Sequence, residues 1–559
     1  MTAIPIITAQ SISAISADSF VESIGINTHW AFPNVYAHNY TGLKVKLAES
    51  GIRYVRDRTH TSVYERANDL YNSLGIKTNM LTGRYEPGPW PSPLDSSQID
   101  AELNEIKTQA LTATISLEGP NEYDHVHGPD VDWVGSIKNY STLLYTKAKA
   151  DELLRNLPII GPSLTSLKSY EAVGDSDSYI DYANLHIYQG SYEPGTDGWY
   201  NNGTGSLTWF LNELARRQSP SGKRVQATET GHHNYLPSDG VSEEADGKYI
   251  ARILAEYFRR GIYRTYKYEL IDEGQPGMEG VFGLLRNDLS EKSGFRAVKN
   301  LITILTDKGP PFQPSTLNYV LNGSMDNVRQ ILFQKRNGDF YLMVWMEVSS
   351  WNVTTKNDLS PPPQQVRLTL HDSNKISSAI LHAFNNSADV NTVNLTINNN
   401  QVTFNVTDKI SIIKLSNSTI AIPHGLYRLT PKSALHSCLE STAEHNHASV
   451  IQSQYLGSFN QQWITEPVKD GYYRLINRAS GRSLSIDDCN AENGSTVESI
   501  DCQTWKFEPL LNDYYRISSK HTHDQYLEVQ LYSSDDYKKI QQSSWLNSNC
   551  QQWKLDRIE

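Results

Sequence analysis

Three similar segments repeat through the last quarter of the 559-residue chain. Each opens with a short aromatic run: GLYRL at 425–429, GYYRL at 471–475 and DYYRI at 513–517. Each closes with a Gln-x-Trp triplet, at 461–463, 503–505 and 551–553. A unit of about forty residues is too small to bury a core by itself, so we expect the three units to assemble as one body with pseudo-threefold symmetry.

This repeated triplet resembles the signature of the ricin B-type β-trefoil lectins. The resemblance implies a carbohydrate-binding domain with a glycan as its ligand and with the three tryptophans in its core. Sugar binding in that family uses an aspartate in each repeat, followed by an aromatic platform. The matching positions hold Glu440, Ser485 with Asp487 close by, and Glu528, and the candidate platforms are Tyr455, Tyr532 and Tyr537. Because these positions depart from the family pattern, we expect one or two working sugar pockets in place of three.

Upstream, between residues 20 and 305, strand-like and helix-like segments alternate, which is typical of a parallel α/β fold. Eight strands are expected, near 23–29, 52–56, 76–81, 112–117, 158–162, 182–188, 223–231 and 263–270. Helix-like segments separate several of them, at 41–50, 64–74, 136–155, 208–217 and 248–260. Polar or aromatic residues follow nearly every strand. This pattern favours a closed (β/α)8 TIM barrel, in which functional groups lie at the C-terminal ends of the strands.

Two of these strand ends carry a glutamate. The apolar run at 112–117 is followed by the turn-rich sequence EGPNE, which contains Asn121 and Glu122, and the strand at 223–231 ends near Glu229. Glycoside hydrolysis needs such a pair of carboxyl groups, one to protonate the leaving oxygen and one to attack or to activate water. A glutamate after a strand is common, so each alone has a structural alternative. The two together, in this order within a βα series, indicate a glycosidase.

The same residues resemble clan A of the glycoside hydrolases, and the family 39-like and family 5-like barrels are the most similar. That clan has Asn-Glu after strand four, Glu ending strand seven, Arg after strand two, and His or an aromatic residue after strand six. The matching residues are Arg56 or Arg58, Asn121 with Glu122, His186 with Tyr188, and Glu229. The resemblance implies a retaining mechanism with Glu122 as acid/base and Glu229 as nucleophile. Tyr268 stands where the clan often has Trp, so the substrate floor is expected to differ.

Further roles follow from this scheme. An arginine at 56 or 58 would keep Glu229 ionised, whereas the charge of Glu229 would raise the pKa of Glu122 so that it starts protonated. Asn121 is placed to bind a sugar hydroxyl, and His186 and Tyr188 are placed to orient Glu229. The predicted substrate-binding residues are Arg56, Asn121, His186, Tyr188, Tyr268, His29 and Trp30. Each has a structural alternative; an arginine that ends a strand is often a simple ion-pair partner.

From residue 311 the pattern changes to short alternating runs with polar turns, such as FYLMVW at 340–345 and VTFNV at 402–406. Such runs are typical of an antiparallel β-sandwich, which many clan A enzymes carry against the barrel. We therefore expect three domains: a catalytic barrel at 1–310, a sandwich at 311–422 and a trefoil at 423–559. The first 18 residues or so could join the sandwich.

The composition of the chain excludes several classes of binding partner and cofactor. The net charge is −12 with no long basic run, which argues against nucleic acid. No stretch has transmembrane length and the N-terminus lacks a basic region, so we expect neither a membrane span nor a signal peptide. All four cysteines lie in the last quarter, without a Cys/His cluster. No metal or other cofactor is therefore expected, although Cys489 and Cys502 could close a short loop.

The sequence thus predicts a retaining glycosidase that acts on an oligo- or polysaccharide and is targeted to carbohydrate by its lectin module. We expect a monomer outside the cell, since several Asn-x-Thr sequons indicate export. The alternative is a catalytically inactive carbohydrate-binding or toxin-like lectin. The presence of both glutamates argues against this alternative.

Overall fold

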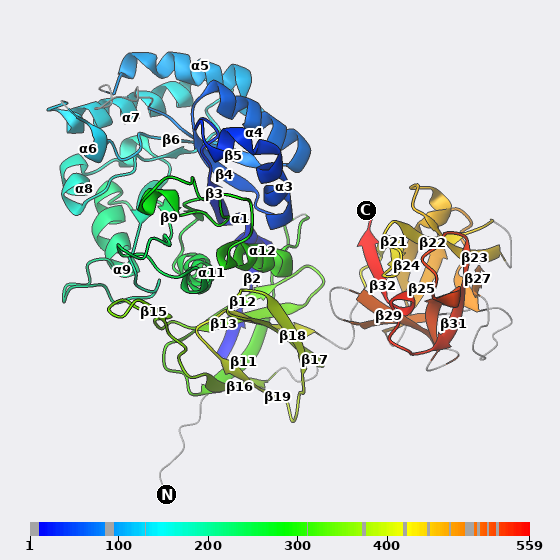
Figure 1. Ribbon diagram of the computed structural model, residues 1–559. Coiled ribbons are helices and arrows are strands. Elements are labelled where there is room, and N and C mark those ends of the chain that lie inside the picture. Colours follow the sequence, from blue (N-terminus) through cyan, green and yellow to red (C-terminus); the bar gives the residue numbers. More distant parts are fainter. Residues whose placement is uncertain are drawn as a thin grey trace, which may run out of the picture. The chain divides into compact units, whose positions relative to one another are not determined.

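The computed structural model describes residues 10–83, 94–128, 130–309, 311–371, 376–416, 422–443, 448–468, 471–486, 497–499, 504–510, 514–520, 522 and 525–558. The chain divides into two compact units. The first holds a barrel and a β-sandwich, and the second consists mainly of the chain from Ser416 onward (Figure 1). Among the described residues, no helix combines the length and the apolar character needed to cross a bilayer.

Eight parallel strands form the barrel of the first unit. They are β3 (Ile24–Asn27), β4 (Tyr54–Arg58), β5 (Lys77–Leu81), β6 (Thr114–Glu118), β7 (Ile159–Ile160), β8 (Ala183–Ile187), β9 (Val225–Thr230) and β10 (Arg264–Lys267). The sheet order runs from β7 through β6, β5, β4, β3, β10 and β9 to β8. A parallel bridge between Ile160 and Tyr182 joins its two ends. The predicted TIM barrel is therefore confirmed.

Helices cover the outside of this barrel (Figure 1). The longer ones are α3 (Tyr40–Ser50), α4 (Thr61–Leu74), α5 (Ile99–Gln109), α7 (Trp133–Ala150), α8 (Leu167–Val173), α11 (Glu243–Arg259) and α12 (Ser293–Leu305). Short ones are α1 (Ala17–Glu22), α2 (Val35–His38), α6 (Tyr123–Val126), α9 (Leu207–Trp209) and α10 (Arg216–Gln218), with a π-helix at Phe210–Ala215 between the last two.

Local sequence fixes where these helices begin and end. The Ser242 side chain accepts the amide hydrogen of Ala245 at the start of α11, whose first turn is acidic. α4 ends at Gly75, which has a φ of 72°, a left-handed conformation that glycine adopts without strain. α5 was not expected from the sequence. The expected strand at 112–117 begins two residues later, because Leu111–Ala113 form a 3-10 turn.

Two sheets pack as the predicted sandwich. One contains β1 (Gln10–Ser13), β11 (Thr316–Gly323), β16 (Gln364–Leu370) and β19 (Gln401–Val406). The other contains β18 (Val390–Leu395), β17 (Ser378–Phe384), β20 (Ser411–Ser416), β13 (Phe340–Met346), β12 (Val328–Gln334) and β2 (Ile15–Ser16). A small hairpin, β14 (Trp351–Asn352) with β15 (Asn357–Asp358), extends from it. The N-terminal strands thus belong to the sandwich.

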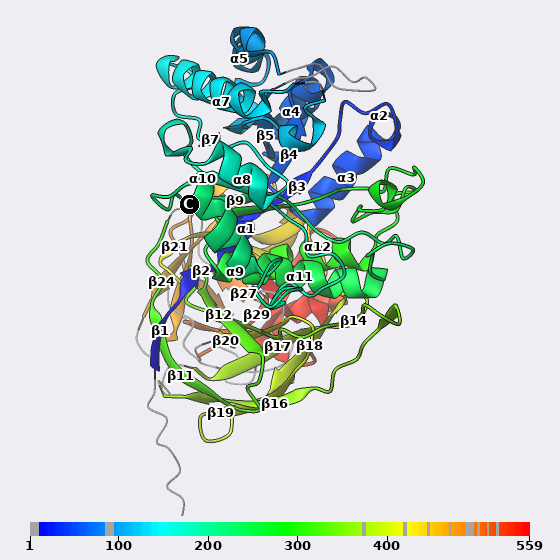
Figure 2. The same cartoon turned by 90° about the vertical axis from the view of Figure 1, so that its left-hand side faces the viewer.

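Helices α11 and α12 lie between the barrel and the sandwich (Figure 2). From α11, the buried Arg252 donates hydrogen bonds to the carbonyl oxygens of Met346 at 2.9 Å and Val348 at 2.7 Å. From α12, the Asn300 side chain donates to the carbonyl oxygen of Ala388 at 2.8 Å. One continuous apolar core includes residues of both layers. The sandwich therefore supports the barrel from one side.

The second unit is a β-trefoil. Among its described residues, six strands close into a barrel: β21 (Gly425–Pro431), β24 (Trp463–Pro467), β25 (Tyr473–Asn477), β28 (Trp505–Pro509), β29 (Tyr514–Ser519) and β32 (Trp553–Arg557). The remaining strands are β22 (Ser437–Ser441), β23 (Ala448–Gln454), β26 (Leu484–Ile486), β27 (Val497–Ser499), β30 (Gln525–Val529) and β31 (Lys538–Ser544). Asp487, Cys489 and Cys502 lie outside the described residues.

The three tryptophans of the repeat occupy equivalent places in this trefoil. Trp463, Trp505 and Trp553 are fully buried. Each indole N–H donates to a leucine carbonyl oxygen, that of Leu439, Leu484 or Leu527, at 2.8 to 2.9 Å. Each buried indole ring therefore has a hydrogen-bond acceptor for its N–H, which is its one polar group, as a buried tryptophan requires. The threefold symmetry predicted from the repeat is present in the core.

Candidate active site

A cavity of about 490 Å³ opens at the C-terminal ends of the barrel strands. Seven predicted residues line it: His29, Arg56, Asn121, Glu122, Tyr188, Glu229 and Tyr268. His186 lies directly behind Glu122 and is almost fully buried. Trp30 does not line the cavity; its buried ring packs edge-on against Tyr36 and Tyr40. The structure therefore brings together all the predicted barrel residues except Trp30.

Arg56, in the middle of β4, connects the two predicted catalytic strands. Its guanidinium donates two hydrogen bonds to Glu118, at 2.8 and 2.9 Å, and one to Glu229 Oε1 at 2.7 Å. It also donates to Asn121 Oδ1 at 2.6 Å. Glu118 is completely buried, and the sequence analysis did not identify it. The available signal was its position at the end of the strand, as the first residue of EGPNE.

Both carboxylate oxygens of Glu229 are held by donors. Oε1 accepts from Arg56, and Oε2 accepts from the Tyr188 hydroxyl at 2.8 Å. Such charge-assisted bonds are short and strong because donor or acceptor is ionised. The Glu229 side chain is 11% exposed and faces the cavity. The two donors therefore fix the position of the Glu229 carboxyl group at the mouth of the barrel.

Glu122 is held in a strained conformation. Its φ of 44° is left-handed, which costs a non-glycine residue about 1–2 kcal/mol. Its backbone N–H donates to both the carbonyl oxygen and the hydroxyl of Ser163, each at 3.1 Å. Strain of this kind is found at functional sites, where the surrounding structure maintains it. The side chain is 27% exposed and reaches the cavity.

The imidazole of His186 is the direct partner of Glu122. Nδ1 lies 2.6 Å from Glu122 Oε1 but 3.5 Å from Glu229 Oε2. Nε2 lies 3.1 Å from the Thr228 hydroxyl, whose own hydrogen points to Asn184 Oδ1 at 2.7 Å or to Glu118. An imidazolium, with a hydrogen on each ring nitrogen, would satisfy both contacts at once.

These contacts set the charges at the site. Burial alone would lower the pKa of His186, but the charges of Glu229 and Glu122 outweigh it and raise that pKa. Burial alone would raise the pKa of Glu122, but the charge and hydrogen bond of His186 lower it. The expectation that Glu229 would raise the pKa of Glu122 is therefore wrong for the unliganded site. These two shifts in pKa favour an imidazolium at His186 paired with a carboxylate at Glu122.

The two glutamates lie close together. One carboxylate oxygen of Glu122, one of Glu229 and a ring nitrogen of His186 all lie within 4.8 Å of one another. A metal ion would have to compete there with Arg56, Tyr188 and the imidazolium for the same oxygens. A second group with ligand atoms for a metal lies beside the cavity and consists of His29, Glu269 and Glu273.

Aromatic side chains form much of the cavity wall. Phe32 stacks on His29 with ring centroids 4.5 Å apart, and Tyr268 meets Phe282 edge to face at 5.3 Å. Met278 and Glu279 complete this wall. The sequence analysis did not select Phe32, Phe282, Met278 or Glu279, because they lie in loops without a periodic pattern.

In the trefoil, the predicted carboxylates differ in exposure. Glu440 is partly exposed and accepts hydrogen bonds from Asn460 at 2.9 Å and Gln461 at 2.8 Å. A cavity of about 310 Å³ lies beside it and is lined by Ser441, Thr442, Ala443, Phe459, Asn460 and Ala479. Glu528 is 1% exposed, and Cys550 stands where the first repeat has Asn460. The first repeat thus offers an accessible polar pocket next to an exposed aromatic ring.

Comparison with known proteins agrees with this architecture. Residues 419–499 and 501–559 match the family model of the ricin-type beta-trefoil lectin domain-like proteins. No curated protein sequence matches the chain. Among solved structures, a family 39 glycoside hydrolase from the gut symbiont Bacteroides cellulosilyticus WH2 is similar, with a TM-score of 0.51 and 14% identity over 71% of this chain and 82% of that one.

Two further structures are also similar. The family 39 enzyme from Xanthomonas axonopodis pv. citri has 15% identity and a TM-score of 0.48, covering 75% of this chain and 98% of that one. The designed threefold symmetric protein ThreeFoil has 29% identity and a TM-score of 0.23, covering 24% of this chain and 99% of that one. The C-terminal part of the chain is therefore a ricin-type β-trefoil lectin-like domain, and the part before it is similar in fold to the family 39 glycoside hydrolase from Bacteroides cellulosilyticus WH2.

Proposed function

We propose that this protein is a retaining glycoside hydrolase whose trefoil domain binds carbohydrate. The observation that carries the proposal is the approach of Glu122 and Glu229, which bring carboxylate oxygens within 4.8 Å of each other. Retaining enzymes separate their carboxyl groups by about 5–5.5 Å, whereas inverting enzymes need about 6.5–9.5 Å to admit a water molecule. The short separation favours direct attack by one carboxylate on the sugar.

Glu229 is the nucleophile in this scheme. Arg56 and Tyr188 each donate a hydrogen bond to its carboxyl group and hold it at the cavity. In the first step, a Glu229 oxygen forms a bond to the anomeric carbon while the bond from that carbon to the leaving oxygen breaks. The product is a covalent glycosyl ester on Glu229. Arg56 then remains paired with Glu118 and Asn121, so its charge stays compensated.

Glu122 is the acid/base and shares one proton with His186. In the unliganded site that proton lies on the imidazole. A bound sugar covers the exposed part of Glu122 and removes water from it, which favours its neutral form. The proton then moves across the 2.6 Å contact to Glu122 and on to the leaving oxygen. In the second step Glu122 takes a proton from the attacking water, and the ester on Glu229 is hydrolysed.

The substrate class is an oligo- or polysaccharide. Phe32, Tyr268 and Phe282 offer apolar faces along the cavity, and apolar ring faces are suited to stacking on sugars. The trefoil pocket beside Glu440 is the proposed site for a second stretch of glycan. Two sites on one chain would raise the effective concentration of the enzyme on a polymer.

A digest of a polysaccharide and aryl-glycoside panel, followed by proton NMR of the first anomer released, tests the proposal. We expect retention of configuration. Glu229→Gln should lower kcat on a responsive substrate by several orders of magnitude, whereas Glu279→Gln, a carboxylate in the same cavity, should keep substantial activity. Inversion of configuration would contradict the mechanism. No hydrolysis of any substrate, with glycan binding retained, would support the inactive lectin instead.

A further inference from the structure

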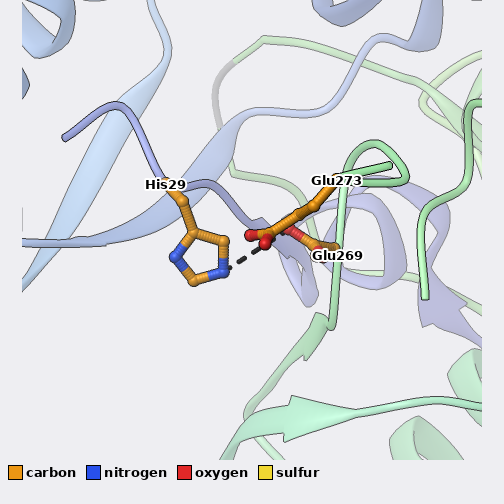
Figure 3. A group of neighbouring side chains, drawn as sticks. All are labelled: His29, Glu269 and Glu273. Carbon is orange, nitrogen blue, oxygen red and sulfur yellow. Dashed lines mark ion pairs between the residues drawn. The ribbon is translucent and has the colours of Figure 1, made fainter. Parts of the chain in front are cut away.

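His29, Glu269 and Glu273 form a compact group at the edge of the catalytic cavity. His29 follows strand β3, and the two glutamates follow strand β10, so the barrel closure places them side by side. Figure 3 shows both carboxyl groups on one side of the imidazole ring. One ligand atom from each residue lies within 4.8 Å of the other two. The group is separate from the carboxylates proposed to act on the sugar.

Protein contacts leave this group incompletely satisfied. His29 Nε2, Glu269 Oε1 and Glu273 Oε1 are buried atoms without a hydrogen bond, although His29 Nε2 approaches the other oxygen of Glu269 at 3.5 Å. The Glu269 side chain is 0% exposed, so bulk water does not supply a hydrogen bond to its unbonded oxygen. Its other oxygen accepts from the Tyr36 hydroxyl at 2.8 Å, and Glu273 Oε2 accepts from Gln275 at 3.0 Å. Three buried polar atoms without hydrogen bonds, on side chains whose ligand atoms lie within 4.8 Å of one another, are costly unless a ligand pairs them.

Cations of the protein do not fill this role. Among the described residues, neither Glu269 nor Glu273 forms an ion pair with a lysine or arginine. The nearby Lys267 is buried, but its ammonium donates to the carbonyl oxygens of His232, Tyr268 and Phe282. Two carboxyl groups thus lie together without a compensating positive charge in contact.

The group of Glu122, His186 and Glu229 provides a contrast within the same fold. There, Arg56, Tyr188 and the imidazolium already supply a donor to three of the four carboxylate oxygens. In the His29 group, an aromatic nitrogen and two carboxylate oxygens make no hydrogen bond. Imidazole nitrogen together with carboxylate oxygen is a donor set typical of divalent transition metals.

We propose that His29, Glu269 and Glu273 bind a divalent transition-metal cation of the Mn²⁺ or Zn²⁺ type. Its remaining coordination positions would be filled by water, since these three residues supply only three ligands. The cation would connect the end of strand β3 to the loop that follows β10. That loop carries Met278, Glu279 and Phe282 into the cavity wall. The metal is therefore a structural brace of the substrate-binding wall and takes no part in glycoside cleavage.

Binding of Mn²⁺ alone to the full chain tests this proposal. The protein is stripped with chelator, titrated with MnCl₂, and the free ion is followed by its electron paramagnetic resonance signal. Mn²⁺ suits the test because it prefers carboxylate oxygen and so binds weakly to surface histidines. We expect one bound ion per chain and a rise in thermal stability that chelator reverses. Glu273→Gln should weaken binding by roughly 10- to 100-fold or more.

Matched variants decide between this site and others. Glu122→Gln, in the other group, should leave Mn²⁺ affinity unchanged. His29→Asn serves as a second test variant if Glu273→Gln misfolds by circular dichroism. Absence of binding to the parent chain, an affinity that survives both test variants, or loss of binding in Glu122→Gln would each overturn the proposal. None of these results depends on whether the protein hydrolyses glycosides.

Discussion

His186 and Glu229 face each other across the neighbouring strands β8 and β9, yet the imidazole contacts Glu122 instead. Its Nδ1 is 0.9 Å closer to Glu122 than to Glu229 (2.6 against 3.5 Å). The histidine therefore contacts the proposed acid/base more closely than the proposed nucleophile. The tyrosine two residues later, Tyr188, contacts Glu229 as expected.

Replacing His186 by Asn should move the basic limb of the pH profile of kcat/KM to lower pH. In the parent chain, His186 holds the one proton that it shares with Glu122. Its pKa is raised by the charges of Glu229 and Glu122, which outweigh the opposite effect of burial. Activity is lost as pH rises through that value. In the variant only Glu122 can hold the proton, and a carboxyl group releases it at lower pH. A basic limb that does not move would contradict the shared proton.

Replacing Glu122 by Gln should affect substrates according to their leaving groups. Sugars and alkyl glycosides need a proton on the departing oxygen, so their kcat/KM should fall by about 10²–10⁴-fold. Dinitrophenyl glycosides leave without this proton, so their first step should change little. Rates are measured on a series of aryl glycosides of graded phenol pKa. An equal loss across the series would indicate that Glu122 has only a structural role.

Replacing Glu118 by Gln should destabilise the barrel. Glu118 is completely buried and receives two hydrogen bonds from Arg56, so its loss leaves a buried guanidinium partly uncompensated. Breaking such a pair costs about 3–5 kcal/mol in free energy of unfolding. Urea unfolding measures this cost. Glu171→Gln is the matched control, because its ion pair with Arg217 is half exposed and is expected to contribute less than about 1 kcal/mol.

A chain that ends at residue 422 should lose polymer binding but keep catalysis. The trefoil is a separate compact unit with its own core, so its removal leaves the barrel and sandwich cores complete. We expect unchanged kcat/KM on a small aryl glycoside. Apparent affinity for a polysaccharide should fall on the order of 10²-fold, because the second site no longer contributes effective concentration.

A single substitution in the full chain provides the matching control for this truncation. Glu440→Ala removes the acceptor for Asn460 and Gln461 beside the trefoil pocket and should also weaken polymer binding. Glu466→Gln, an exposed carboxylate of the same domain, should not. Loss of small-substrate hydrolysis in a folded truncated chain would show that the two units are not independent.

The structural elements that could be predicted best from the sequence are those with a repeated pattern. Strands of the barrel could be read from apolar runs that end in polar residues, and the trefoil could be read from three Gln-x-Trp triplets. Strands β11, β17 and β20 were not recognised; β20 reads SIIKLS and is buried along its whole length despite its lysine. Such a strand gives no alternation, because both of its faces are covered.

Site residues that act through other residues were harder to predict. Glu118 meets Arg56 from a position 62 residues away, and only the neighbouring register of strands β4, β5 and β6 brings them together. Trp30 follows a strand end as a ligand-binding residue would, but its ring turns back into the core against Tyr36. The position of a residue at a strand end predicts that it lies near the active site. Whether its side chain reaches the cavity depends on the direction in which that side chain points.

The pairing of β1 with β11 has a consequence for synthesis of the chain. Gln10 leaves the ribosome about three hundred residues before its partner Tyr319. At about 5–20 residues per second, this strand waits roughly 15–60 s without its neighbour. During that time the barrel strands can already close, while an unpaired edge strand remains open to wrong pairing. Nascent chains stalled before residue 316 should therefore recruit chaperones through their first residues, and release from chaperone should coincide with emergence of the sandwich.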